Sequence, residues 1–548
     1  MVPTDTLKIE YAEDKEVTIE SLIPKEKAKM FIRAQVEGRL RELSYLVKGP
    51  TTIELFGLKG DAESMYIYKN TLMFVIAMAA HQVCPDLHLI FSNDVSRSIY
   101  ISSADNQATV TLKEINLIKE ETERLVKADL PIKKILIPKQ EAIETYKKLG
   151  MSDKLDILRY RPEGMVHCYV CSTYQDYLYG YMAPSTGYVG KFNFIPRLPG
   201  FLVQFPRAEE KGLIPSFKSE PVFERTIEET KDWSKKVGLD TIAGINDFAK
   251  AYGPTDFIMM CESHHNNQLA ELGEMISSSP LPIKLICIAG PSSSGKTTFA
   301  NRLRLELLSR GLFPIRISCD DYYKEKKDIV PEEDGSYDLE SISAIDVDLF
   351  NDQMLRLSEG EEVTLPHFNF VKGVREDGRT LRLGPGQPII VEGIHALNER
   401  MTSSVAQHNK FKIFIAPQAQ INIDNHTPIS LTDLRLIRRI VRDSKFRHAS
   451  AEDTIQMWPS VRRGEFNWIY ATQEEADYVF NSLLPYELCV MRKYALPLIS
   501  QVQKTSPAYV TCRRLIMFLK YFSDLEENDV PDNSLMREFI GGSCFKDV

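Results

Sequence analysis

The chain has 548 residues, of which 43% are hydrophobic and 26% charged, and its formal net charge is −9 at pH 7. This length predicts three or four domains, and the acidic balance argues against broad electrostatic attraction to nucleic acid or to an anionic membrane surface. The most apolar segment, residues 72–80, is much shorter than the ~20 residues that cross a bilayer, and the acidic N-terminal sequence is unlike a signal peptide. We therefore expect no membrane partner and a cytoplasmic location.

The first half of the chain predicts two small mixed domains and a connector. Residues 1–60 alternate short strands around one helical stretch at residues 25–46, which predicts an α+β domain. Residues 61–215 begin with a helix at residues 68–83 and end in an aromatic run punctuated by Gly and Pro, which predicts a second α+β domain. Residues 216–280 predict a helical connector that ends at the breaker SSSPLP.

From residue 281 onward, short apolar runs alternate with helical segments. The runs are LPIKLICIAG, FPIRISCD, QPIIVEGIH, FKIFIAP and ADYVFNS. Such alternation is typical of βαβ units, so residues 281–500 predict an α/β domain with a parallel sheet covered by helices. Residues 501–548 predict a helical extension.

A phosphate-binding loop is predicted at residues 290–298, GPSSSGKTT, which matches GxxxxGK[ST] between a strand at 284–289 and a helix at 298–310. In such a loop, main-chain N–H groups and the helix N-terminus bind phosphates. Lys296 would neutralise the outer phosphates, and the Thr297 hydroxyl would bind Mg²⁺. An accidental Gly/Ser turn is the alternative. The residues predicted to bind ATP are Gly290, Ser292, Ser293, Ser294, Gly295, Lys296, Thr297 and Thr298.

Two acidic residues follow apolar runs of the predicted sheet. Asp320 comes after residues 315–318, and Glu392 comes after residues 388–391. Ligands of open parallel sheets bind beyond the carboxyl ends of strands, so Asp320 could accept a hydroxyl proton and Glu392 could bind Mg²⁺. Asp321 is the competing candidate for the base, and a helix cap or turn is the alternative role for either carboxylate.

Four arginines share one face of a predicted helix, because Arg435, Arg438, Arg439 and Arg442 are spaced i, i+3, i+4 and i+7. Like charges gathered in this way predict a lid that meets ATP phosphates, with Arg447 extending its basic character. The alternative is a solvated face paired with Asp433 and Asp443.

With these pieces in order, residues 281–500 resemble the uridine kinase and phosphoribulokinase family. The matching motifs are GPSSSGKTT, SCDDYY, YDLESISAID, PHFNF, IIVEGIHALNE and DLRLIRRIVRD. The resemblance implies that Asp320 is the general base for a nucleoside 5′-hydroxyl and that Glu392 serves Mg²⁺. It also implies an acceptor pocket with Tyr323 and Asp338, and phosphate or substrate contacts from Arg439 and Arg442.

Two positions depart from this family. Phe368 stands where uridine kinases carry a Tyr, and Gly373 stands where they carry a His. Both family residues recognise the pyrimidine base, so a pocket without them discriminates less sharply between bases.

Residues 1–215 resemble the TGS-like and editing-type domains of threonyl-tRNA synthetases. The positions of the editing metal ligands correspond here to Asn70, Phe74, Leu178 and Met182. Phe, Leu and Met do not suit zinc, so we expect a core or docking role without a metal.

Together these observations predict phosphoryl transfer from ATP to uridine or cytidine, as in pyrimidine salvage. One alternative acceptor is another small alcohol or a sugar phosphate. A different class of function is an ATP-gated protein that binds tRNA or another RNA through a local basic surface such as Lys133, Lys134 and Lys139. The family resemblance also makes a homo-oligomer an expectation.

Overall fold

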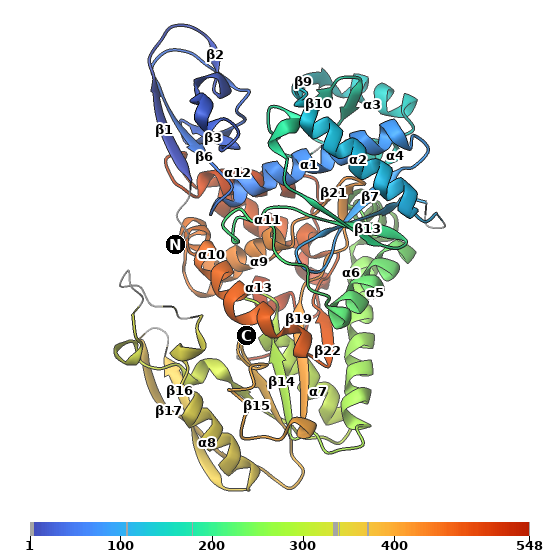
Figure 1. The fold of residues 1–548 in the computed structure, drawn as a ribbon. Helices are drawn as coiled ribbons and strands as arrows, with labels where there is room; N and C mark the ends of the chain where they lie inside the picture. Colours follow the sequence, from blue (N-terminus) through green and yellow to red (C-terminus); the bar gives the residue numbers. More distant parts are fainter. Residues whose placement is uncertain are drawn as a thin grey trace.

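The computed structural model describes residues 5–105, 108–177, 179–331, 338, 340–369 and 372–546. A sheet of strands and its helices occupy one end of the molecule, and the N-terminal units occupy the other (Figure 1). Helices from the last quarter of the chain lie between these two ends (Figure 1). Within the described ranges, the helices are all too short or too polar to cross a bilayer.

The first unit is an antiparallel sheet in the order β1-β6-β3-β4. Its strands are β1 (Thr6–Tyr11), β3 (Arg33–Val36), β4 (Arg39–Arg41) and β6 (Thr51–Phe56). The predicted helix at residues 25–46 is wrong, because this segment forms the short 3-10 turn η2 (Lys25–Lys27) followed by β3 and β4. Val36 pairs with Arg39, and Glu37 and Gly38 between them both have positive φ, 51° and 73°. This two-residue turn closes a hairpin and excludes a helix.

The second unit surrounds the long helix α1 (Ala62–Val83), which confirms the helix predicted at residues 68–83. The helix starts earlier than predicted because the Asp61 side chain caps it by accepting the Ser64 N–H at 2.9 Å. It packs against α2 (Leu112–Ala128) and shares a hydrophobic core with a sheet β12-β13-β8-β7. The strands of this sheet are β7 (Leu89–Asn93), β8 (Ile99–Ser103), β12 (Asn193–Arg197) and β13 (Gly200–Gln204).

A second sheet of this unit has the order β11-β10-β9. It consists of β9 (Lys133–Pro138), β10 (Met165–Cys171) and β11 (Tyr174–Asp176), with α3 (Lys139–Lys148) and α4 (Ser152–Tyr160) beside it. The connector that follows contains α5 (Pro221–Lys236) and α6 (Ile242–Ser277). Gly253, with φ 83°, and Pro254 interrupt the helical geometry of α6.

The predicted parallel sheet is confirmed, in the order β15-β18-β14-β19-β22 with every neighbouring pair parallel. Its strands are β14 (Leu285–Ala289), β15 (Ile315–Ser318), β18 (Ile389–Glu392), β19 (Lys410–Ala416) and β22 (Tyr478–Asn481). All five residues of β14 are buried, as expected for a central strand covered on both faces. Helix α7 (Lys296–Ser309) packs on β14, β15 and β18, and α5 packs on β22, whereas α9 (Leu431–Phe446), α10 (Ala451–Gly464) and α11 (Glu487–Ser500) pack on one another.

An excursion from this sheet carries α8 (Val347–Ser358) and the hairpin β16 (Glu362–Asn369) and β17 (Val374–Arg382), which lie to one side of the sheet (Figure 1). Another hairpin, β20 (Asn422–Asp424) and β21 (Thr427–Pro428), reaches the N-terminal half. There, the buried Lys154 ammonium lies 3.0 Å from Asp176 and 3.1 Å from Asp424, so a charge triad joins the two halves.

The end of the chain returns to the centre of the molecule (Figure 1). It contains α12 (Tyr509–Leu519) and the single turn α13 (Arg537–Ile540), which packs on α9. Leu535 and Phe539 are fully buried in the core shared with the parallel sheet. The described part of this segment, residues 501–546, therefore belongs to the packed structure around the sheet.

Candidate active site

The carboxyl ends of three parallel strands bring the predicted site residues to one edge of the sheet. In the sheet register, Glu392 at the end of β18 pairs with Ile288 on one side and with Ser318 on the other. The loop at residues 290–295 follows β14, and Asp320 follows β15 in the turn η4 (Cys319–Tyr322). Ligands of such sheets bind at this edge.

The backbone of the predicted phosphate loop has the required shape. Ser293 and Gly295 both have left-handed φ values, 60° and 92°, which turn successive N–H groups toward one concavity before α7 begins. Gly290 is constrained by packing, because a Cβ on it would lie 2.0 Å from the carbonyl oxygen of Ile415. A side chain at this position would push the loop off the sheet.

Three hydroxyl groups in this loop are available to donate hydrogen bonds to a ligand. Within the described part of the chain, the hydroxyls of Ser293, Ser294 and Thr298 are buried and have no hydrogen-bond partner. A buried polar group without a partner costs about 1–3 kcal/mol, whereas phosphate oxygens would accept from all three hydroxyls. The loop therefore fits the phosphates of a nucleotide.

Lys296 is held inside the loop. Its Nζ donates to the carbonyl oxygen of Gly290 at 2.9 Å and to that of Pro291 at 3.2 Å. Burial lowers the pKa of Lys296, while the nearby carboxylates Glu392 and Asp320 favour its charged form. The ammonium group thus lies among the predicted catalytic acids.

The two adjacent acids after β15 have different environments. Asp321 accepts hydrogen bonds from His367 Nδ1 at 3.0 Å and from the Phe368 N–H at 3.3 Å, so it anchors β16. The Asp320 carboxylate makes no hydrogen bond or ion pair with the residues that the structure describes, and burial raises its pKa. Of the two candidates for a base, Asp320 has the free carboxylate.

Glu392 and its neighbours fit a magnesium ion. Glu392 is buried, and its pKa rises to about 7 because of this burial and the charge of Asp320. Nη1 of Arg316 lies 3.7 Å from Oε1 of Glu392. The carboxylates of Glu392 and Asp320, which repel each other, present the oxygen ligands that Mg²⁺ prefers.

On the acceptor side, the structure brings Tyr323 and Phe368 together, with ring centroids 5.7 Å apart. Asp338 accepts from Trp468 Nε1 at 3.2 Å and from the Glu340 N–H at 3.1 Å. Gly373 lies in the turn between β16 and β17 with φ 67°, where a Cβ would meet open space.

The first two arginines of the predicted lid face contact the main chain of the phosphate loop. Arg435 donates to the Ser292 carbonyl oxygen from Nε and Nη2 at 3.0 and 2.9 Å, and it pairs with the buried Glu465. Arg438 is fully buried and pairs with Glu487 at 2.5 Å. Both guanidinium groups are thus occupied by carboxylates and main-chain carbonyls rather than facing open space for a phosphate.

The remaining arginines converge on one carboxylate. Asp443 lies 3.1 Å from Arg439, 2.8 Å from Arg442 and 3.6 Å from Arg447. Arg439 also donates to the Ser292 hydroxyl at 2.7 Å. The alternative interpretation is therefore correct in its pairing with Asp443 but wrong about solvation, because Arg435, Arg438 and Arg439 are all at most 6% exposed.

The C-terminal segment contributes residues that no motif predicted. The Thr298 N–H, at the N-terminus of α7, donates to Glu538 Oε2 at 3.1 Å. Leu535 covers Gly295 so closely that a Cβ on this glycine would lie 2.5 Å from Leu535 Cδ2. A carboxylate therefore takes one of the amides that a nucleotide phosphate would use, and no motif in the sequence indicated this contact.

Comparisons with known proteins agree with this geometry. The phosphoribulokinase / uridine kinase family model matches residues 285–487. A uridine kinase of Borrelia duttonii is 33% identical over 205 residues, covering 36% of this chain and 85% of that protein. A uridine kinase of Staphylococcus aureus is 31% identical over 196 residues, covering 36% of this chain and 86% of that protein.

Among solved structures, a possible uridine kinase from Bacillus stearothermophilus aligns with 40% of this chain and 100% of its own, with 18% identity and a TM-score of 0.29. The family assignment rests on the sequence relatives, both of which are covered for more than four fifths of their length. The resemblance of residues 1–215 to synthetase domains stays a prediction. Through its C-terminal kinase domain, the chain belongs to the phosphoribulokinase / uridine kinase family.

Proposed function

We propose that this domain transfers the γ-phosphoryl group of ATP to the 5′-hydroxyl of a nucleoside, with uridine and cytidine as the expected acceptors. The observation that carries the proposal is the free carboxylate of Asp320 at the same sheet edge as a phosphate loop with three unpartnered hydroxyls. The named activity of the two bacterial relatives supports the choice of a nucleoside.

In this reaction the hydroxyl oxygen forms a bond to the γ-phosphorus while its proton passes to Asp320. The bond between this phosphorus and the bridging oxygen breaks, and ADP leaves. Lys296 and the loop amides hold the phosphates in place, so catalysis is mainly positioning and charge stabilisation. Mg²⁺, for which Thr297 and Glu392 are the proposed ligands, neutralises charge on the phosphate oxygens when bound.

The residues of the acceptor pocket specify a nucleoside less clearly than the residues of the phosphate loop specify ATP. Tyr323 and Phe368 offer aromatic rings, and Asp338 would accept from ribose hydroxyls once its present donors are shared. Phe368 lacks the hydroxyl of the family Tyr, which removes one polar contact to a base. A sugar phosphate or another small alcohol is therefore the competing acceptor.

The test measures ADP release with a panel of nucleosides and sugar phosphates, using the wild-type chain and Asp320→Asn. We expect turnover with uridine or cytidine and a loss of about 10²- to 10⁴-fold in kcat for Asp320→Asn, the usual contribution of a general base. Asp352→Asn is the matched control, because its side chain is 59% exposed on α8.

Equal turnover by wild type and Asp320→Asn would remove Asp320 from the mechanism. Turnover with a sugar phosphate but with no nucleoside would replace the proposed acceptor. Thermal unfolding of each variant shows whether a lost rate comes from lost chemistry or from lost structure.

A further inference from the structure

A second cavity, of about 440 Å³, lies between the N-terminal half and the C-terminal helices. We call it the aromatic cavity, and its walls come from β4, α1, the segment around β11, β21, the first turn of α9, and α12. Helices α1 and α12 meet beside it (Figure 1), where Arg514 of α12 pairs with Glu63 of α1 at 2.9 Å.

Positive charge dominates the lining of the aromatic cavity. The only two carboxylates among its described lining residues, Glu63 and Asp433, are both bound by Arg514. Arg161 donates to the hydroxyls of Tyr177 and Tyr521, both at 3.0 Å. The seven lysine and arginine residues that line it are Arg39, Arg41, Lys69, Lys134, Arg161, Arg513 and Arg514.

Four of these cations have no ion-pair partner among the described residues. The side chains of Arg39, Lys69 and Arg513 make no hydrogen bond there, and Nε of Arg41 is buried without a hydrogen-bond partner. Burial and the charge of Arg207 lower the pKa of Lys69 to about 8. Gathering cations in a concave site is unfavourable unless an anion enters, so the lining favours an anionic ligand.

Aromatic rings form another part of the wall. Tyr66, Tyr177, Tyr179, Tyr181 and Tyr521 all line the cavity, and the Lys134 ammonium lies 4.7 Å from the centroid of the Tyr181 ring. Stacking on such rings binds planar bases with little dependence on their sequence or identity. A ligand with one planar ring system and one phosphate would use both parts of this lining.

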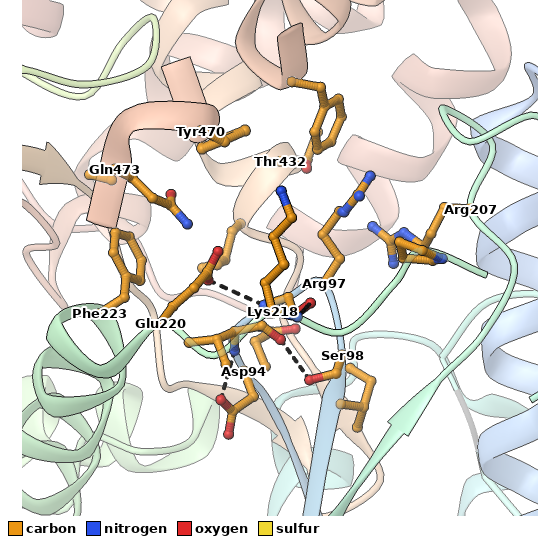
Figure 2. Close-up of a pocket in the computed structure, with 18 of the residues that line it drawn as sticks. Asp94, Arg97, Ser98, Arg207, Lys218, Glu220, Phe223, Thr432, Tyr470 and Gln473 are labelled. Atoms are coloured by element: carbon orange, nitrogen blue, oxygen red, sulfur yellow. Dashed lines mark hydrogen bonds between the residues drawn. The ribbon is translucent and has the colours of Figure 1, made fainter. Parts of the chain in front are cut away.

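A neighbouring cavity of about 430 Å³ beside Pro291 makes the contrast clear. Figure 2 shows Arg97, Arg207, Lys218 and Glu220 on its wall. Arg97 lies 2.9 Å from Glu210, and Arg207 lies 3.2 Å from Glu209. Arg97 and Arg207 are thus already paired with carboxylates, whereas Arg39, Arg41 and Arg513 of the aromatic cavity form no ion pair with the described residues.

We propose that the aromatic cavity is a second nucleotide site, which binds a free nucleoside monophosphate with its base among the tyrosines and its phosphate near Arg41 and Arg513. The volume suits a small ligand, since pockets for such ligands span ~300–1,000 Å³. The net charge of −9 disfavours a long polyanion, which makes a free nucleotide a better occupant than a nucleic acid.

The position of the cavity links it to the phosphate loop. Ser430, which caps α9 by accepting the Asp433 N–H at 3.2 Å, is also 3.0 Å from the Tyr66 hydroxyl. The same helix carries Arg435, which holds the Ser292 carbonyl. A bound nucleotide therefore touches the start of the helix that supports the ATP loop, and we expect it to change the apparent affinity for ATP.

The test is calorimetric titration of the full chain with UMP, repeated with Asp320→Asn, Arg41→Glu and Arg513→Glu. The expected result is saturable binding that Asp320→Asn retains and that either arginine reversal weakens by at least 10-fold. Lys113→Glu, an exposed charge reversal on α2, is the matched control and keeps the wild-type affinity. Tyr181→Leu, at a ring that is 38% exposed, should weaken binding without unfolding the chain.

Absence of saturable UMP binding, or equal binding by Arg513→Glu and wild type, overturns the proposal. So does binding of a single-stranded RNA oligonucleotide that free UMP cannot displace, because the cavity would then serve RNA. The inference does not depend on the proposed kinase reaction: a chain that releases no ADP but binds UMP in an Arg513-dependent manner would keep the second site and lose only the first.

Discussion

Removing the Glu538 carboxylate should strengthen ATP binding. In the structure Glu538 accepts the Thr298 N–H at 3.1 Å, at the helix N-terminus where a nucleotide phosphate would bind, and its charge would repel that phosphate. A hydrogen bond to a charged group contributes about 1.5–3 kcal/mol. Because about 1.4 kcal/mol corresponds to a factor of ten, Glu538→Ala should lower the Kd for ATP by about 10-fold or more.

The assay is calorimetric titration with a non-hydrolysable ATP analogue and Mg²⁺. Glu120→Ala, an exposed carboxylate on α2, is the control for a simple change of net charge and should leave the Kd unchanged. Truncating the tail is a poorer experiment, because Leu535 and Phe539 are fully buried. An unchanged or weaker affinity of Glu538→Ala would refute the idea that the tail competes with the nucleotide.

Three further measurements test the structure. Arg438→Met leaves Glu487 buried and unpaired, which should lower the free energy of unfolding by about 3–5 kcal/mol and lower the Tm. Adding Glu487→Gln should restore part of this stability, and an unchanged Tm of Arg438→Met would contradict a buried ion pair. Burial holds the pKa of His395 at about 4 against 6.5, so the folded state resists protonation and loses up to about 3 kcal/mol as pH falls between these values. The urea midpoint of His395→Gln should depend less on pH between these values than the midpoint of the wild type. The same pH dependence in both proteins would contradict the lowered pKa of His395. With its pKa near 8, Lys69 should be acetylated faster than Lys113 at pH 8, as measured by mass spectrometry, and equal rates would argue against its burial.

Local sequence patterns were sufficient to predict the features that depend on residues close together in the chain. The phosphate loop at 290–298 follows from glycine spacing between a strand and a helix, and the structure shows β14, α7 and the left-handed Gly295 that this spacing requires. The five apolar runs after residue 281 are the five parallel strands, since strands of a parallel sheet covered on both faces are rich in apolar residues. Asp320 and Glu392 follow from the same patterns, because carboxyl ends of parallel strands share one edge.

Tertiary contacts decided the rest. Residues 25–46 carry a helical pattern, yet a two-residue turn at Glu37 and Gly38 pairs them as strands, and sheet pairing with β6 stabilises that choice. The i, i+3, i+4 spacing correctly placed Arg435 and Arg438 on one helix face, but it carried no information about what that face meets. Their partners Glu465 and Glu487 lie 30 and 49 residues away along the chain.

The same reason applies to the tail and to the aromatic cavity. Glu538 meets Thr298 across 240 residues of sequence, and the cavity gathers side chains from β4 to α12. For the kinase domain, sequence alone determined the parallel strands, the phosphate loop and the family, because these depend on residues close together in the chain. Tertiary structure decides which charged side chains form ion pairs and which stay free to bind a ligand, because the partners come from segments that are distant in the sequence.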